Sequence, residues 1–225
     1  MSNTVQIKVC GMRDPANIEA LAKLPIGLMG FIFYPKSPRA VKGDALEKWL
    51  HQQGQSVRLP RRVGVFVNAP IEDVLNRVHD FSLDYVQLHG TESPSYCREL
   101  RELWSLTSMS GAQLIKAFSV GSGFDFSEVE AYAPFCAYAL FDTQTEGFGG
   151  SGESFDWSLL AAYSGSLPFF LSGGLGPDQL EAIRAFRHPR LAGLDLNSRF
   201  EEKPGLKNIE ALQNFVSTFI KNKIE

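Results

Sequence analysis

Short apolar segments alternate with segments of helical periodicity along this chain, and this alternation limits the possible folds more than any other feature. Several apolar segments carry apolar or aromatic side chains at consecutive positions, as strands buried on both faces do. We expect strands at Val5–Cys10, Leu28–Phe33, Arg62–Val67, Asp84–Leu88, Leu114–Phe118, Ala137–Phe141, Leu167–Leu171 and Leu191–Leu196. Strands that alternate with helices in this way form a parallel sheet covered by helices.

The segments between these strands repeat apolar side chains three or four positions apart, which is the spacing of one helix face. We expect helices around Ile18–Leu24, Leu46–Leu50, Ile71–Val78, Cys97–Trp104, Val129–Tyr132, Trp157–Leu160, Leu180–Phe186 and Lys207–Lys221. Prolines 15, 70, 94 and 177 stand near four helix starts. Proline is tolerated in a first turn because the N–H that it lacks would have no partner within the helix.

Eight repeats of strand and helix in 225 residues predict a (β/α)8 TIM barrel that forms a single domain over residues 1–225. No linker rich in proline, glycine or serine divides the chain. An open doubly wound sheet is the competing architecture. Both folds place an active site at the C-terminal ends of the strands, so functional residues are expected there.

The overall composition limits the class of partner and the compartment. The net charge of −3 lacks the basic excess of a general nucleic-acid binder, and no apolar stretch is long enough to span a bilayer. Cys10, Cys97 and Cys136 form neither a C-x-x-C motif nor an even disulfide framework, which favours a reducing compartment. We therefore expect a cytoplasmic protein that binds neither nucleic acids nor membranes.

Polar and ionisable residues gather at the C-terminal ends of the predicted strands, where a barrel keeps its chemistry. In chain order they are Cys10, Arg39, Gln87, His89, Lys116, Asp142, Gly173, Gly174, Asp195, Asn197 and Ser198. Taken singly, a thiol at a strand end is often a small buried hydrophobic group, and an arginine in a loop is often a surface residue. The pattern by itself leaves their roles open.

Residues Gly147–Gly152 have the form G-x-G-x-x-G of a dinucleotide-binding fingerprint. They begin several residues after their strand, and Ser172 stands where an acidic residue would be needed about twenty positions later. We therefore predict no dinucleotide site here. A mobile loop over a substrate beside Asp142 is the better interpretation.

An ordered set of motifs from Lys8 to Asn208 resembles the phosphoribosylanthranilate isomerase family of tryptophan biosynthesis. The motifs are KVCG, GFIFYPKSPR, VGVFVN, VQLHG, LIKAF, FDT, GFGGSG, FDW, LSGGL, GLDLNS and PGLKN. The resemblance implies an Amadori rearrangement of N-(5′-phosphoribosyl)anthranilate to 1-(2-carboxyphenylamino)-1-deoxyribulose 5-phosphate. It also implies that neither a metal nor an organic cofactor is needed.

By this resemblance, Cys10 matches the general base of the family and Asp142 matches the general acid. A thiolate can act as a base near neutral pH if nearby positive charge lowers its pKa. Asp142 has to carry a proton when the substrate binds. Arg39 matches the arginine that holds the anthranilate carboxylate, for which the planar guanidinium is suited.

The resemblance also implies a phosphate site and further contacts with the substrate. Backbone N–H groups after the last two strands fit the phosphate position that is common in barrels, at Gly173, Gly174, Asn197 and Ser198. Gln87, His89, Lys116 and Asp195 are further candidates for substrate contact. Each has a structural alternative, and for Lys116 this is an ion pair with a barrel carboxylate.

Two alternative functions follow from the same residues. A histidine-pathway isomerase is expected to carry a carboxylate base after its first strand and a second phosphate site, and Cys10 argues against it. A non-catalytic phosphate-binding barrel would not need both Cys10 and Asp142. We therefore expect an isomerase that acts on a small phosphorylated molecule, as a monomer or a homodimer.

Overall fold

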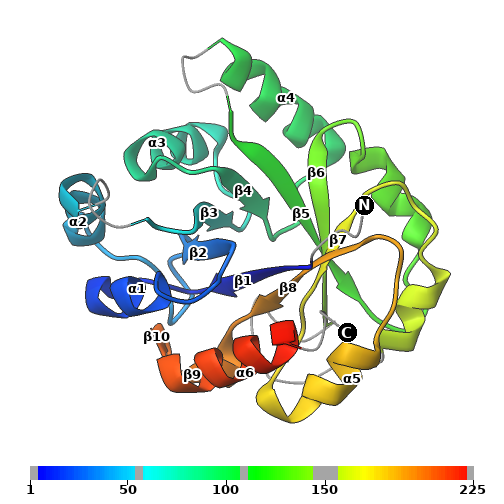
Figure 1. Cartoon of the computed structure of the whole chain (residues 1–225). Coiled ribbons are helices and arrows are strands. Elements are labelled where there is room, and N and C mark those ends of the chain that lie inside the picture. Colours follow the sequence, from blue (N-terminus) through cyan, green and yellow to red (C-terminus); the bar gives the residue numbers. More distant parts are fainter. Residues whose placement is uncertain (1–4, 54–57, 107–110, 144–156, 222–225) are drawn as a thin grey trace.

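Parallel strands form a closed barrel in the computed structural model, which describes residues 5–53, 58–106, 111–143 and 157–221 (Figure 1). The strands are β1 (Gln6–Cys10), β2 (Leu28–Ile32), β3 (Arg61–Phe66), β4 (Tyr85–Leu88), β5 (Gln113–Val120), β6 (Cys136–Thr143), β7 (Phe169–Leu171) and β8 (Leu191–Leu196). Strand β8 pairs with β1, and Lys8 lies beside Asp195 at this closure. The predicted barrel is confirmed, because pairing of the first and last strands excludes an open sheet.

Helical segments surround the strands in a ring (Figure 1). They are α1 (Pro15–Leu21), α2 (Ala45–Gln53), α3 (Ile71–Phe81), α4 (Pro94–Ser105), η1 (Phe126–Tyr132), η2 (Trp157–Ala162), η3 (Pro177–Gln179), α5 (Leu180–Ala185), η4 (Ser198–Phe200) and α6 (Ile209–Lys221). Pro15 and Pro94 open α1 and α4 as predicted, each after an N-cap side chain that accepts a backbone hydrogen bond. None of the described helices is long and apolar enough to cross a membrane.

Several elements differ from the prediction. After β5 and β6 the chain forms the 3-10 segments η1 and η2 where α-helices are predicted, so the backbone of these connections follows the tighter i→i+3 bonding. Strand β6 runs past its predicted end, so Asp142 pairs with Ser119 inside the sheet. The antiparallel hairpin β9 (Glu201–Lys203) and β10 (Leu206–Lys207) follows β8 and has no counterpart in the prediction.

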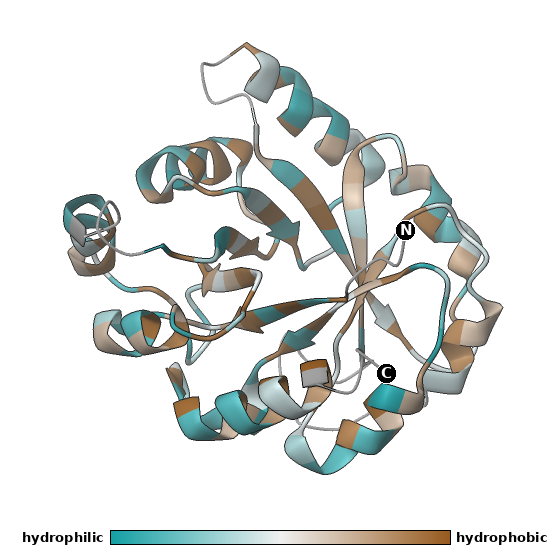
Figure 2. Cartoon of the chain, in the orientation of Figure 1, coloured by the Kyte–Doolittle hydropathy of each residue, from teal (hydrophilic) through white to brown (hydrophobic). Residues whose placement is uncertain are grey.

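Most of the hydrophobic core lies between the strands and the surrounding helices. Val9 and Phe31 on strands, and Leu100 and Val216 on helices, are fully buried in this layer. Figure 2 shows the strands as mainly hydrophobic and the helices as mixed, with hydrophilic residues among the hydrophobic ones. The consecutive apolar positions of the strands thus serve two layers, one outside the barrel and one inside it.

The layer inside the barrel supports the site at the C-terminal rim. It consists of Leu28, Val63, Tyr85, Ile115, Ala117, Leu140 and Phe170. Because strand side chains alternate between the two faces, Tyr85 lies one layer below Gln87, and Leu140 lies one layer below Asp142. The polar residues at the rim therefore stand on packed apolar side chains.

We expect Phe170→Ala to destabilise the barrel, because Phe170 is fully buried in the inner layer. Removal of the ring should lower the free energy of unfolding by about 3–5 kcal/mol, which urea denaturation followed by circular dichroism would measure. Leu106, which is 82% exposed, provides the control. Leu106→Ala should change the free energy of unfolding by less than about 0.5 kcal/mol, and a similar loss in both variants would contradict the prediction.

Candidate active site

A cavity opens at the C-terminal ends of the strands, with about 690 Å³ of space that includes open solvent at its mouth. Its lining consists of Cys10, Ile32, Tyr34, Ser37, Val65, Val67, Gln87, His89, Asp142, Ser172, Gly173, Gly174, Leu175, Asp195, Asn197 and Ser198. Every predicted site residue is in this set except Arg39 and Lys116. Residues distant in sequence converge here because all strands of a parallel barrel end at the same rim.

Lys8 and Asp195 form a buried ion pair one layer below Cys10. Lys8 precedes Cys10 by two positions on β1, so both side chains point into the barrel. Nζ of Lys8 donates to both carboxylate oxygens of Asp195 at 2.8 Å, and Lys8 is fully buried. Burial acts to lower the pKa of Lys8. The negative charge of Asp195, together with Cys10, outweighs burial, so the net shift of this pKa is upward. Burial raises the pKa of Asp195, and Lys8 opposes this rise. Lys8 therefore holds its positive charge near the thiol.

Cys10 lines the cavity, and the residue is 4% exposed. Burial raises the pKa of Cys10, and the negative charge of Asp195 raises it further. The ammonium groups of Lys8 and Lys207 act in the opposite direction and lower this pKa. The net direction is upward, because burial outweighs the two lysines. The positive charge that the family resemblance requires is present, but by itself it does not lower the pKa of Cys10.

Gln87, His89 and Asp142 form a chain of polar contacts across β4 and β6. Nε2 of Gln87 lies 2.8 Å from Nδ1 of His89, and Nε2 of His89 lies 3.4 Å from Oδ2 of Asp142. An amide N–H can only donate, so Nδ1 of His89 accepts the hydrogen bond from Gln87. A neutral His89 then carries its proton on Nε2, which faces Asp142. Oε1 of Gln87 is buried and has no hydrogen-bond partner among the described residues. The cavity thus contains a buried acceptor.

The turns after β7 and β8 combine glycines with small polar residues at one side of the cavity. Gly173 and Gly174 have φ angles of 87° and 68°, a left-handed conformation that favours glycine. Backbone N–H groups in such turns can face an anion. Arg199, the charged residue after Ser198, is 40% exposed and pairs with Asp178 at 2.7 Å. It is not part of the cavity lining.

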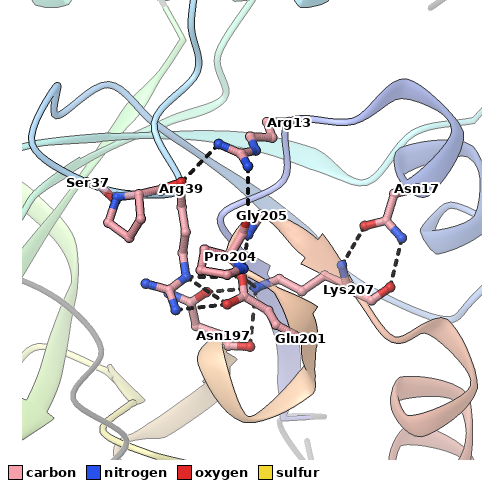
Figure 3. A network of polar contacts seen from close by, with 10 residues as sticks. Arg13, Asn17, Ser37, Arg39, Asn197, Glu201, Pro204, Gly205 and Lys207 are labelled. Atoms are coloured by element: carbon pink, nitrogen blue, oxygen red, sulfur yellow. Dashed lines mark hydrogen bonds and ion pairs between the residues drawn. The ribbon is translucent and has the colours of Figure 1, made fainter.

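Arg39 lies beside the cavity in a network of polar contacts that involves the β9–β10 hairpin (Figure 3). Nε of Arg39 donates to Oε1 and Oε2 of Glu201 at 3.0 and 2.9 Å, and Nη2 lies 2.8 Å from Oε2. Lys207 donates from Nζ to Oε1 of Glu201 and to Oδ1 of Asn197, each at 2.7 Å. Burial acts to raise the pKa of Glu201, but Arg39 and Lys207 outweigh burial and lower this pKa. Burial lowers the pKa of Lys207 itself, and Glu201 opposes this shift. Glu201 is therefore an anion held by two basic side chains.

Lys116 does not reach the cavity, contrary to the expectation of substrate contact. Ala117 points into the barrel, so Lys116, its neighbour on β5, points outward. Nζ of Lys116 donates to the carbonyl oxygens of Gly90 and Ala117 at 2.8 Å and lies 3.6 Å from Glu92. The structural alternative, an ion pair with a carboxylate, describes Lys116.

Sequence reasoning did not assign roles to Lys8, Glu201 and Lys207, which all carry charge next to predicted site residues. Lys8 had a usable signal, because a lysine two positions before Cys10 on a buried strand must point into the barrel and needs an anionic partner. Glu201 and Lys207 had no such signal, because their contacts depend on the unpredicted hairpin.

The predicted loop over the substrate, Gly147–Gly152, lies outside the described residues. Within the ranges that the structure describes, no group of three or more His, Cys, Asp or Glu side chains could hold a metal ion.

Fold and cavity together define an enzyme of the (β/α)8-barrel class, with a thiol and a carboxyl group at the catalytic rim. Residues 7–218 match the family model described as N-(5′-phosphoribosyl)anthranilate (PRA) isomerase. The N-(5′-phosphoribosyl)anthranilate isomerase of Parabacteroides distasonis is 49% identical to this chain over 220 residues, which cover 97% of the chain and 95% of the relative. The chain therefore belongs to the N-(5′-phosphoribosyl)anthranilate isomerase family, as its motifs indicate.

Solved structures agree with this assignment. The crystal structure of phosphoribosyl anthranilate isomerase from Thermotoga maritima has a TM-score of 0.80 and 31% identity, and the match covers 96% of this chain and 98% of that one. Another phosphoribosyl anthranilate isomerase structure contains reduced 1-(o-carboxyphenylamino)-1-deoxyribulose 5-phosphate. It has a TM-score of 0.76 and 28% identity, with coverage of 96% of this chain and 98% of that one.

The raised pKa of Cys10 predicts how its reactivity depends on pH. Because the thiolate is the reactive form, the rate of Cys10 alkylation by iodoacetamide should keep rising with pH beyond the range of an ordinary thiol. Lys8→Met removes the cation that favours the thiolate and should slow alkylation at pH 8 by about tenfold, the effect of one pKa unit. Peptide mapping would separate Cys10 from Cys97 and Cys136. Equal rates in both proteins would contradict the role of Lys8.

Proposed function

We propose that this chain converts N-(5′-phosphoribosyl)anthranilate to 1-(2-carboxyphenylamino)-1-deoxyribulose 5-phosphate, with Cys10 as general base and Asp142 as general acid. The observation that carries this proposal is that Cys10 from β1 and Asp142 from β6 line the same cavity. Membership of the isomerase family supports the choice of reaction.

The rearrangement needs one proton donor and one proton acceptor. Asp142, in its protonated form, gives a proton to the ring oxygen of the ribose, and the C1′–O bond breaks to leave an iminium ion. Cys10, as a thiolate, removes the proton from C2′, and the electrons of that bond neutralise the iminium nitrogen to give an enolamine. Tautomerisation of the enolamine yields the ketone. Lys8 and Lys207 stabilise the thiolate during this sequence.

The ends of the substrate are held on different sides of the cavity. The phosphate binds to backbone N–H groups of the turns after β7 and β8, at Gly173, Gly174, Asn197 and Ser198. Gln87, His89 and Asp195 contact the ribose hydroxyl groups, and the buried Oε1 of Gln87 accepts one hydrogen bond from them. Arg39 binds the anthranilate carboxylate from the side of Tyr34 and Ser37, which precede it in the same loop.

We also propose a cytoplasmic enzyme that acts as a monomer or homodimer and binds a phosphorylated small molecule. Three free cysteines support the compartment. The two alternative functions are less well supported, because the family match and the thiol at Cys10 favour neither a histidine-pathway isomerase nor a binding protein.

A turnover assay tests the proposed reaction. Phosphoribosylanthranilate generated in place from anthranilate and phosphoribosyl pyrophosphate should lose its fluorescence at a rate proportional to the protein concentration, after subtraction of spontaneous hydrolysis. Chromatography should identify carboxyphenylamino-deoxyribulose phosphate as the product. Folded protein that produces none of this compound would rule out the proposal.

The two catalytic assignments predict large losses of kcat. Cys10→Ala and Asp142→Asn should each lower kcat by at least about 10²- to 10⁴-fold, the usual contribution of a positioned acid or base. Cys97→Ala, which removes a thiol from the core rather than from the cavity, should keep kcat within about twofold of the original value. Full kcat in Cys10→Ala would show that another group removes the C2′ proton.

Arg39→Ala should act mainly through KM, because Arg39 contacts a part of the substrate that does not react. The loss of a charged hydrogen-bonded pair should raise KM by about 10- to 100-fold and leave kcat within a few-fold. Arg39→Lys keeps the charge but loses the planar fork, so KM should remain high. An unchanged KM with a reduced kcat would contradict this role.

A further inference from the structure

Glu201 is an anion with a largely buried side chain, at a position that the proposed mechanism does not use. It opens β9, and its side chain is 4% exposed. Oε1 of Glu201 accepts hydrogen bonds from Nε of Arg39 at 3.0 Å, from Nζ of Lys207 at 2.7 Å and from the backbone N–H of Gly205 at 3.0 Å. A carboxylate with this many donors has a fixed orientation, and so do the donors that it holds.

The way in which Glu201 contacts Arg39 leaves one edge of the guanidinium for another anion. Glu201 binds the edge formed by Nε and Nη2 (Figure 3). A guanidinium has a second edge, formed by Nη1 and Nη2, which is equally suited to a bidentate carboxylate. Charge is also favourable, because Arg39 and Lys207 carry two positive charges against the single negative charge of Glu201. The cluster therefore keeps a net positive charge.

The same cluster is packed directly against the residue that follows Cys10. A Cβ atom on Gly11 would lie 3.0 Å from Cδ of Arg39 and 3.1 Å from Oδ1 of Asn197, so both side chains occupy the space beside Gly11. Lys207 holds Asn197 through Oδ1. The position of the Arg39 guanidinium is thus fixed relative to the strand that carries Cys10.

We propose that Glu201 is a positioning residue that presents the Nη1–Nη2 edge of Arg39 to the carboxylate of the substrate. This inference rests on the proposed function. Arg39 has a long flexible side chain. If Glu201 fixes the orientation of its guanidinium in advance, less conformational entropy is lost when the substrate binds. Glu201 does not touch the substrate and acts through Arg39.

A pair of ligands that differ only in the carboxylate tests this role. The first is 1-(2-carboxyphenylamino)-1-deoxyribitol 5-phosphate, made from ribose 5-phosphate and anthranilate by reductive amination. The second is the same compound made with aniline, which lacks the carboxylate. Isothermal titration calorimetry should show that Glu201→Gln weakens binding of the first ligand by about 10- to 100-fold, because the guanidinium is no longer held in position. Binding of the second ligand should change by less than about twofold.

Several variants separate positioning from a structural role. Glu202→Gln changes the exposed neighbour on β9 and should bind both ligands as the original protein does. In Arg39→Ala, the added change Glu201→Gln should cause no further loss, because Glu201 acts only through Arg39. If Glu201→Gln fails to fold, Glu201→Asp keeps the charge but shortens the side chain and should show the same selective loss.

The outcomes distinguish this inference from the proposed function. If Glu201→Gln weakens binding of both ligands equally, or weakens binding of neither, the positioning role is wrong. The proposed function stands in that case, provided that the original protein still turns over its substrate. If the original protein neither turns over phosphoribosylanthranilate nor prefers the carboxylated ligand, the proposed function is wrong, and this inference fails with it.

Discussion

The ion pair between Lys8 and Asp195 lies where the barrel closes, and the site depends on it in two ways. It joins the first strand to the last inside the barrel, with Nζ of Lys8 2.8 Å from both carboxylate oxygens. Breaking a buried pair by removal of one partner typically costs about 3–5 kcal/mol, because the remaining charge has no compensation. The pair also places a fixed cation near Cys10, where a thiolate would need one.

A second group of charges stands at the edge of the cavity and has a different purpose. Glu201, Lys207 and Arg39 connect the hairpin after β8 with the loop after β2, two segments far apart in the sequence. The pair under Cys10 is electrically balanced, whereas this cluster has an excess positive charge. That difference suits an interior that must hold one thiol and an edge that would receive a substrate anion.

Much of the fold and of the site could be predicted because the determining signals are local. Apolar runs and first-turn prolines fixed the order of strands and helices, and the ends of parallel strands had to share one rim. The length of β6 was missed, because backbone pairing with β5 decides it. The 3-10 segments were missed, because apolar spacing does not distinguish them from short α-helices. Arg39 and Lys116 were placed in the site by the family resemblance and their position after or within a strand, neither of which shows their contacts. The structure puts Lys116 on the outer face of β5 and binds Arg39 to Glu201.

The sequence by itself determined the barrel, the family and the residues that stand at the strand ends, because periodicity and motif order are properties of the chain in one dimension. Only the tertiary structure decided which charges meet. Lys8 and Asp195 are 187 positions apart, and Arg39 and Glu201 are 162 positions apart. Burial raises the pKa of Cys10, whereas Arg39 and Lys207 keep Glu201 ionised in spite of burial. Both effects result from packing that no local segment contains.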